Sequence, residues 1–294
     1  MKIHELIARE GSCISFEFFP PKTEEGEDKL FEVIARLEPL HPGYVSVTYG
    51  AGGSTARNTH RIIKRIRDTT SITPIPHLTC MDQSKDDLRK MLEEYRDEGI
   101  QNVLALRGDP PEDKNMELPE DRFCYAKELV TLVKSFNHFS IGVAVYPEGH
   151  CEAPDLETDM KHTVEKINAG ADFAITQMFF ENRYFFSFMD RAANAGISVP
   201  VIAGIMPITD MTKIMRFAEL CGATLPLSLI EKMETAASLE EVKKIGIDYA
   251  TRQCEELWSE GTKYLHFYTL NKAEAVIEIL HNLGLDKREI SVKL

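Results

Sequence analysis

The chain has 294 residues, of which 43% are hydrophobic and 28% charged, and its formal net charge is -13. This composition is typical of a globular protein with a large core. The excess of acidic residues argues against a nucleic-acid partner, because phosphate binding requires clustered Lys and Arg.

The N-terminal stretch and the cysteines indicate a cellular location. Residues Met1 to Glu10 are too charged for a signal peptide, and no apolar run approaches the roughly twenty residues of a membrane span. The six cysteines form neither a C-x-x-C pair nor a zinc-ligand pattern. We therefore expect a cytoplasmic protein with no membrane partner and no structural metal.

Eight short apolar runs, rich in β-branched residues, predict strands. In chain order they are Cys13–Phe19, Tyr44–Gly50, Pro74–Cys80, Asn102–Gly108, Ser140–Pro147, Phe173–Phe180, Val199–Pro207 and Tyr264–Asn271. A helical pattern follows each run, and the units repeat at roughly thirty residues, which is the outline of a (β/α)8 barrel, or TIM barrel. We expect residues 1–294 to form one such catalytic domain.

Apolar residues at three- and four-residue intervals predict the helices between these strands. They are Glu24–Leu37, Thr55–Arg67, Lys85–Glu98, Arg122–Phe136, Leu156–Ala169, Asn182–Ala195 and Thr209–Leu220. Ser84 is the predicted N-cap of the third helix. Two extra helical stretches, near Leu225–Thr235 and Leu239–Ser259, separate strands seven and eight and would lie beside the active face of a barrel.

Glu17 is the most unusual of the polar residues at the predicted strand ends. It stands in Ser15-Phe16-Glu17-Phe18-Phe19, so strand alternation places Ser15, Glu17 and Phe19 on one face and the other two aromatics on the opposite face. A carboxyl group in an apolar barrel mouth has its pKa raised by desolvation, which suits a general acid. The alternative is a structural pair with Arg107 or another cation in the barrel.

Further candidates follow other strands. In Arg107-Gly108-Asp109 the two charged residues share a face, and Gly108 allows a ligand close to the backbone. The alternative is an internal Arg107–Asp109 pair that only orders the loop. His77 lies near a strand end. It could contact a ligand there, or it could be a residue of the core. Three more strand-end residues allow the same two interpretations and are Tyr146, Gln177 and Tyr268.

A glycine-rich segment, Gly50-Ala51-Gly52-Gly53-Ser54-Thr55, follows the second strand and precedes a helix. A dinucleotide-binding fingerprint would need Gly or Ala at the sixth position and an acidic residue about twenty positions later. Thr55 occupies the sixth position, so we reject a Rossmann site and predict a loop at the barrel mouth.

These segments together resemble the single-barrel bacterial type of the methylenetetrahydrofolate reductase family. The matching motifs are Ser15-Phe16-Glu17-Phe18-Phe19-Pro20-Pro21-Lys22, Val45-Ser46-Val47-Thr48-Tyr49-Gly50-Ala51, Pro76-His77-Leu78-Thr79-Cys80, Ala105-Leu106-Arg107-Gly108-Asp109, Ala144-Val145-Tyr146-Pro147-Glu148, Ala169-Gly170-Ala171-Asp172, Ile175-Thr176-Gln177, Gly204-Ile205-Met206-Pro207 and His266-Phe267-Tyr268-Thr269-Leu270-Asn271. They occur in family order from residue 15 to residue 271.

The resemblance implies non-covalent FAD, NADH or NADPH as reductant, and ping-pong reduction of 5,10-methylenetetrahydrofolate to 5-methyltetrahydrofolate. Positions that match FAD contacts of the family are Thr48, Tyr49, Ala51, His77, Arg107, Gly108, Asp109, Tyr146, His150, Ala153, Asp159 and Lys166. Positions that match substrate contacts are Glu17, Asp109, Gln177, Lys213, Phe217 and Lys272.

The resemblance also implies roles for three of these residues. Glu17 would be the general acid that protonates N10 of the folate. Asp109 would favour the resulting 5-iminium cation and lower the flavin potential. Gln177 would contact folate and nicotinamide in turn.

Four positions depart from the family pattern. His162 and Glu165 stand where bacterial relatives often carry Asn and a basic residue, at FAD ribose and phosphate contacts. Lys213 replaces a common Gln, and Lys272 replaces an Arg, which removes bidentate carboxylate recognition. FAD binding and folate affinity could therefore differ from those of the relatives.

Two other functions stay open. One is a barrel lyase or aldolase, but the predicted strands end without a Schiff-base Lys. The other is a flavoprotein subunit that takes electrons from a partner protein. We also expect a homo-oligomer.

Overall fold

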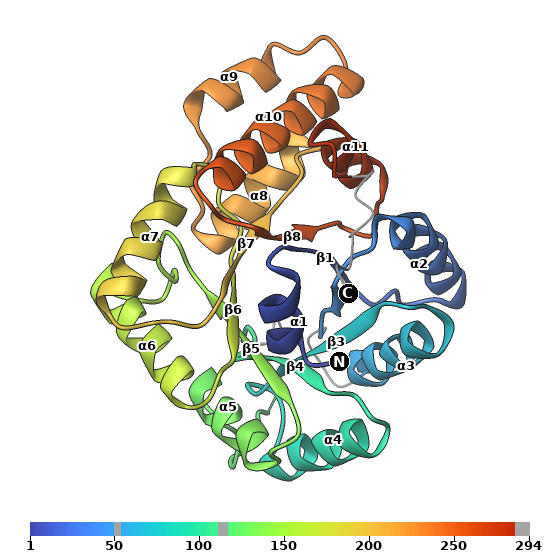
Figure 1. The fold of residues 1–294 in the computed structure, drawn as a ribbon, viewed down its shortest axis with the longest axis vertical. Coiled ribbons are helices and arrows are strands. Elements are labelled where there is room, and N and C mark those ends of the chain that lie inside the picture. The colour runs from blue at the N-terminus through green and yellow to red at the C-terminus, as the bar shows by residue number, and fades with distance from the viewer. Residues whose placement is uncertain (50–53, 111–116, 286–294) are drawn as a thin grey trace.

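The computed structural model describes residues 1–49, 54–110 and 117–285. Eight parallel strands pair in chain order and close into a barrel, as predicted (Figure 1). They are β1 (Cys13–Phe18), β2 (Tyr44–Val47), β3 (Thr73–Thr79), β4 (Asn102–Leu106), β5 (Ser140–Val145), β6 (Phe173–Thr176), β7 (Val201–Ile205) and β8 (Tyr264–Tyr268). Closure is made by β1 against β8, where Ser15 is in register with His266 and Glu17 with Tyr268.

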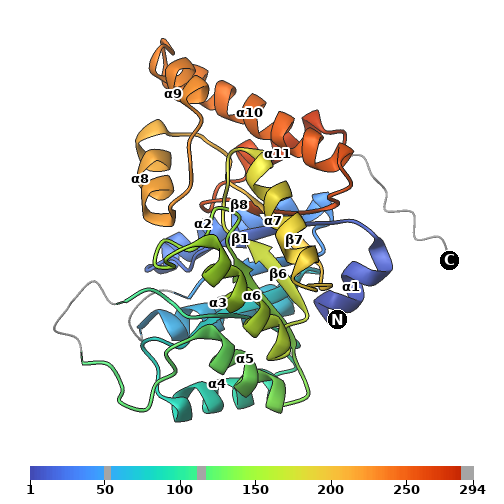
Figure 2. The same ribbon diagram turned by 90° about the vertical axis from the view of Figure 1, so that its left-hand side faces the viewer.

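Helices surround the strands. They are α1 (Ile3–Glu10), α2 (Glu24–Leu37), α3 (Ser54–Thr69), α4 (Lys85–Asp97), α5 (Ala126–Ser135), α6 (Leu156–Asn168), α7 (Asn182–Asn194), α8 (Met211–Cys221), α9 (Leu227–Glu234), α10 (Leu239–Ser259) and α11 (Glu274–Asn282), with a short 3₁₀ helix at Glu38–Leu40. The two extra helices predicted between strands seven and eight are confirmed as α9 and α10, which lie with α8 at one end of the molecule (Figure 2). Within the described residues, no helix is long and apolar enough to cross a membrane.

Polar side chains set where several helices begin. An oxygen of each cap accepts a hydrogen bond from the backbone N–H three residues later, which satisfies one of the free donors of the first turn. These caps are Thr23, Ser84, Asp155, Asp210 and Ser238. The predicted cap at Ser84 is thereby confirmed, and Asp210 explains why α8 starts at Met211 rather than at Thr209. The α5 prediction was also too long, because the Glu128 carboxylate accepts from the N–H groups of Cys124 and Tyr125 just before the helix.

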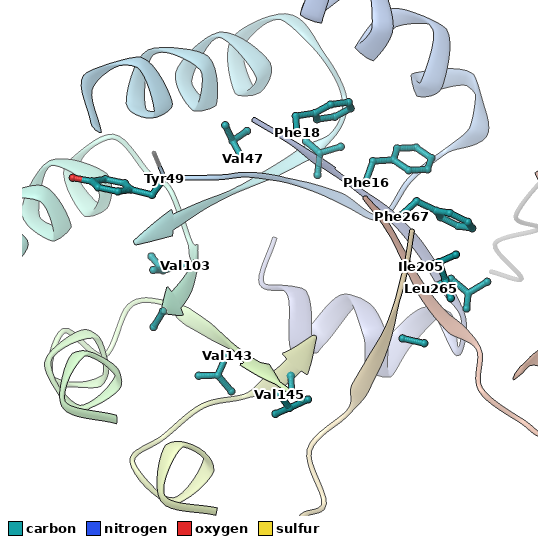
Figure 3. Packing of buried hydrophobic residues seen from close by; sticks show 14 of the residues in the cluster. Phe16, Phe18, Val47, Tyr49, Val103, Val143, Val145, Ile205, Leu265 and Phe267 are labelled. Atoms are coloured by element: carbon teal, nitrogen blue, oxygen red, sulfur yellow. The ribbon is translucent and has the colours of Figure 1, made fainter. Parts of the chain in front are cut away.

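The main core lies between the barrel and its helices. Phe16 and Phe18 of β1 and Phe267 of β8 are buried there together (Figure 3). Their neighbours Ser15 and Glu17 face the barrel interior, so the predicted alternation along β1 is correct. Phe19 does not continue this pattern, because it lies beyond the strand end and is exposed.

A second apolar cluster closes the N-terminal end of the barrel. Ile3, Leu6 and Ile7 of α1 pack against strand residues that include Tyr44 and Phe173. Figure 1 shows α1 across the centre of the barrel. This helix precedes the first strand and is not part of the predicted strand–helix repeat. Because α1 fills this end, the opposite end, where the strands finish, is available for a site.

Candidate active site

Glu17 lies inside the barrel mouth among residues from three other strands. Its Oε2 is 3.3 Å from Nε2 of His77 on β3 and 3.6 Å from Nε2 of His266 on β8. The Ser46 hydroxyl on β2 donates to the same oxygen at 3.4 Å. The side chain of Glu17 is 20% exposed, so one edge of the carboxylate remains open.

The protonation state of Glu17 differs from the sequence-based expectation. Burial raises its pKa, but the imidazoles of His266 and His77 outweigh that effect, so the pKa is lowered to about 2. The raised pKa expected for this carboxyl group is therefore wrong. Arg107 is not the partner of Glu17, because it pairs with Glu152, but the alternative of a pair with another residue of the barrel agrees with the contacts to His77 and His266.

A short hydrogen-bonded chain extends from Glu17 away from the opening. His266 is fully buried, and its Nδ1 lies 2.8 Å from the Ser15 hydroxyl. That hydroxyl donates to the carbonyl of Leu265 at 3.2 Å, so its oxygen can accept a hydrogen bond from an N–H at Nδ1. Burial lowers the pKa of His266. Sequence reasoning did not single out His266, although its position two residues before Tyr268 on β8 places it on the same strand face.

Arg107 and Asp109 do not pair with each other. The Arg107 guanidinium forms a bidentate salt bridge with the Glu152 carboxylate, in which Nη2 lies 3.0 Å from Oε1. The alternative of an internal Arg107–Asp109 pair is therefore wrong. Gly108 between them has a φ of 83°, which turns the chain so that Asp109 is exposed after the strand.

A cavity of about 320 Å³ opens beside this segment, between the ends of β4 and β5 and helices α5 and α6. Six of the predicted cofactor-binding residues line it and are Arg107, Tyr146, His150, Ala153, Asp159 and Lys166. The wall also contains Tyr125, Lys127 and Glu152, which the sequence analysis did not single out. Its volume is within the range of small-molecule sites.

Lys166 supplies a partly buried cation to this cavity. Its Nζ donates to the carbonyl of Ala144 at 2.6 Å and lies 5.5 Å from the centre of the Tyr146 ring. Burial lowers the pKa of Lys166 to about 8, and the nearby Asp159 opposes this effect. The same loss of hydration raises the pKa of Asp159.

The remaining predicted cofactor residues lie around the mouth. His77 is buried, and its Nε2 contacts the Glu17 carboxylate. Thr48 follows β2 and donates its backbone N–H to Phe18 at 2.8 Å. The Tyr49 ring packs in the outer core instead of facing the mouth (Figure 3). Ala51 lies outside the described residues.

The predicted substrate residues are spread over the same end of the barrel. Gln177 follows β6, and its Oε1 accepts from the N–H of Met178 at 2.9 Å. Lys213 is exposed on α8 and lies 3.6 Å from Asp210, whereas Phe217 is half-buried against the cluster beneath that helix. Lys272 is exposed just after β8. In the residues that the structure describes, no hydrogen bond or ion pair joins these side chains to Glu17.

The two departures in the FAD pattern, His162 and Glu165, contact each other at the outer edge of the cavity. Glu165 Oε2 lies 3.2 Å from Nδ1 of His162 and 2.9 Å from Nζ of Lys127. Among residues 1–49, 54–110 and 117–285, no group of three His, Cys, Asp or Glu side chains could hold a metal ion.

The fold and the site define a (β/α)8-barrel protein with a carboxylate–histidine cluster at the strand C-termini and a cavity lined by both basic and acidic side chains. A solved structure described as an uncharacterized protein from Clostridium thermocellum that binds two copies of 5-methyl-5,6,7,8-tetrahydrofolic acid shares this fold. It covers 97% of both chains with a TM-score of 0.65 and 18% identity.

Sequence comparison identifies the family. The family model for methylenetetrahydrofolate reductase matches residues 2–284. The 5,10-methylenetetrahydrofolate reductase of Escherichia coli (strain K12) is 41% identical over 274 residues, which are 92% of this chain and 90% of the relative. Methylenetetrahydrofolate reductase (NADH) 1 of Arabidopsis thaliana is 39% identical over 308 residues, covering 100% of this chain and 52% of the plant protein. The chain belongs to the methylenetetrahydrofolate reductase family.

Proposed function

We propose that the chain reduces 5,10-methylenetetrahydrofolate to 5-methyltetrahydrofolate with bound FAD and with NADH or NADPH as the reductant. Family membership supports the reaction. The observation that carries the assignment to this site is the Glu17–His77–His266 cluster at the strand C-termini, beside the cavity that contains Arg107 and Lys166.

The cavity suits the phosphate-containing part of FAD. Arg107 and Lys166 place two cations in its wall, and a diphosphate needs such donors. The buried His77 ring lies beside Glu17 at the barrel mouth, where the redox ring would lie. When bound, the group supplies hydride transfer from the nicotinamide to the folate methylene carbon.

Glu17 is the residue placed to deliver the proton that N10 of the folate needs. Its low pKa means that the carboxylate must first take up a proton. Covering it with substrate removes water and strengthens the burial effect, which favours the protonated form. The proton can come through His266, whose Nε2 contacts the Glu17 carboxylate and whose Nδ1 contacts the Ser15 hydroxyl. Glu17 then acts as the general acid.

Asp109 and Gln177 follow the C-terminal ends of two different strands, β4 and β6. The Asp109 carboxylate, exposed after β4, would stabilise the cationic iminium form of the substrate. Gln177 has an amide that can donate to one ligand and accept from another. One amide serving folate and nicotinamide in turn requires that the two ligands bind alternately, which is the basis of ping-pong kinetics.

Anaerobic half-reactions test the proposal. The purified protein should contain about one FAD per chain, its flavin absorbance should bleach with NADH or NADPH, and 5,10-methylenetetrahydrofolate should restore the colour. Steady-state data should give parallel double-reciprocal lines. A protein that binds no added FAD would refute the proposal, whereas bound flavin that neither nucleotide bleaches would favour electron delivery by a partner protein.

A further inference from the structure

Two cysteines lie on neighbouring segments at the C-terminal side of the strands and take no part in the chemistry above. Cys151 is exposed in the segment between β5 and α6, and Cys221 is half-buried at the last residue of α8. Both are free thiols. The residues on either side of Cys151, His150 and Glu152, line the cavity, whereas α8 carries predicted substrate residues. The two thiols therefore belong to the cofactor side and to the substrate side of the site.

These two segments are held against each other. The backbone N–H of Thr224, just after α8, donates to both carboxylate oxygens of Glu148 at 3.1 Å. Gly222 ends α8 with a φ of 69°, and a Cβ atom at its position would lie 3.7 Å from Cβ of Cys151. The Cβ atoms of a disulfide lie about 3.5–4.5 Å apart. Cys221, the residue next to Gly222, therefore needs only a small turn of the end of α8 to reach Cys151.

The surroundings of the two thiols set the order in which they react. The thiolate is the reactive form, and an exposed cysteine meets an oxidant first, so Cys151 is the entry point. Burial raises the pKa of the Cys221 thiol to about 11, and the nearby Asp109 and Cys151 add to this effect. Cys221 therefore keeps its proton until an oxidised sulfur lies beside it, which is the behaviour of a resolving cysteine.

We propose that Cys151 and Cys221 form a reversible disulfide that weakens substrate binding under oxidising conditions. The oxidant is a low-molecular-weight disulfide such as oxidised glutathione. The Cys151 thiolate attacks one of its sulfurs, the S–S bond breaks, and one glutathione leaves as the thiolate. Cys221 then loses its proton, attacks the Cys151 sulfur and releases the second glutathione. Two electrons pass from the protein to glutathione, and the two protons go to the released thiolates.

The disulfide acts on the substrate side through α8. Phe217 lies four residues before Cys221, so the two side chains are on one face of the helix, and both pack against the same apolar cluster. Drawing Cys221 toward Cys151 turns this face and displaces Phe217, which matches a substrate contact of the family. The crosslink itself does not depend on the proposed function, whereas its effect on folate binding rests on it.

Peptide mapping of the oxidised holoenzyme tests the crosslink. After treatment with oxidised glutathione, mass spectrometry should find one peptide pair joined through Cys151 and Cys221. In Cys221→Ser, Cys151 should stop at the mixed disulfide with glutathione. Cys124→Ser is the matched control, since Cys124 is also exposed but lies just before α5, and it should still form the joined pair. Finding both thiols free, or each one carrying glutathione, in the unmodified protein would overturn the proposal.

Steady-state folate reduction measures the consequence of the crosslink. Oxidation should raise KM for 5,10-methylenetetrahydrofolate roughly tenfold, the size expected for losing one aromatic contact. Dithiothreitol should restore the original KM, and Cys151→Ser and Cys221→Ser should show no such change on oxidation. An unchanged KM in the crosslinked enzyme would overturn the effect on substrate binding. A fully reduced enzyme that reduces no folate would instead refute the proposed function, and the peptide map would still decide whether the crosslink forms.

Discussion

Two opposing effects act on the carboxyl group of Glu17. Burial favours its neutral form, and the imidazoles of His77 and His266 favour its charged form more strongly. Glu17 is therefore ionised before the substrate binds. A ligand that covers the carboxylate removes water from it and shifts its protonation equilibrium toward the neutral form. The acid of the proposed reaction is therefore generated during the catalytic cycle.

Glu17→Gln should separate the two half-reactions. Flavin reduction by the nicotinamide should be nearly unchanged, because that step needs no proton from Glu17. Folate reduction should slow by roughly 10²–10⁴-fold, the usual contribution of a general acid. Stopped-flow absorbance measures each step separately. Equal losses in both steps would instead assign Glu17 a structural role.

Lys166 should make the stability of the flavin-free protein depend on pH. Its pKa in the folded protein is lowered to about 8 from the ordinary 10.5, so the unfolded chain binds more protons between these values. Stability due to this group therefore rises as the pH increases from about 8 to 10.5. Lys166→Met should be more stable than the unmodified protein at pH 7.5, and the difference should shrink by pH 10. Urea unfolding at the two pH values measures it, and a difference that does not vary with pH would contradict the assignment.

Helix α1 acts as the apolar cover of the N-terminal end of the barrel. The Nδ1 of His4 lies 2.8 Å from the Ser140 hydroxyl, and the backbone N–H of Ile3 donates to the Asn102 side chain at 2.8 Å. These bonds attach the helix to the starts of β4 and β5. The cover lies on the side away from Glu17, so it should affect stability more than catalysis.

Ile7→Ala tests this role of α1. Ile7 is 1% exposed, and removing a buried side chain of this size typically costs about 2–5 kcal/mol. The free energy of unfolding should fall by that amount, while kcat at a temperature where the variant is folded should be preserved. Glu5→Ala, at an exposed position of the same helix, is the control and should change little. A large loss of kcat in the folded Ile7→Ala variant would mean that α1 influences the site.

Strands and surface helices could be predicted because their apolar periodicity is local. All eight strands and both extra helices were predicted in the right places, although runs such as Phe173–Phe180 extend past the ends of the strands, here β6 at Thr176. Helix starts were less certain, because side-chain caps such as Asp210 and Glu128 decide them. Helix α1 was missed because its apolar residues complete a cluster made by strands far along the chain.

The site was predicted less completely than the fold. Strand ends identified Glu17, His77 and Arg107, but not their partners, because pairing across the barrel depends on register. His266 reaches Glu17 only because β8 closes against β1. The pKa of Glu17 was expected in the wrong direction for the same reason, since burial was counted and the imidazoles were not. Likewise, Glu152 is 45 residues from Arg107, and only the folded loops bring them together.

The cavity joins separate parts of the molecule, so its ligand should stabilise the whole barrel. Its lining comes from β4, β5, α5, α6 and the segment between β5 and α6. A ligand that binds only the folded state adds about 2.7 kcal/mol at a concentration one hundred times its Kd. FAD added to the flavin-free protein should therefore raise Tm in a concentration-dependent way. Differential scanning calorimetry measures this shift, and an unchanged Tm at saturating FAD would contradict the cavity as its site.

The closure of β1 against β8 also has a consequence for biosynthesis. The hydrogen bond between Ser15 and His266 joins residues that are 251 positions apart in the sequence. Contacts between residues far apart in the sequence are slow to form during folding. During synthesis they cannot form until the second of the two residues has emerged from the ribosome. Until β8 has left the exit tunnel, Glu17 is present without His266. The contact between Glu17 and His266 therefore forms only after β8 has been synthesised.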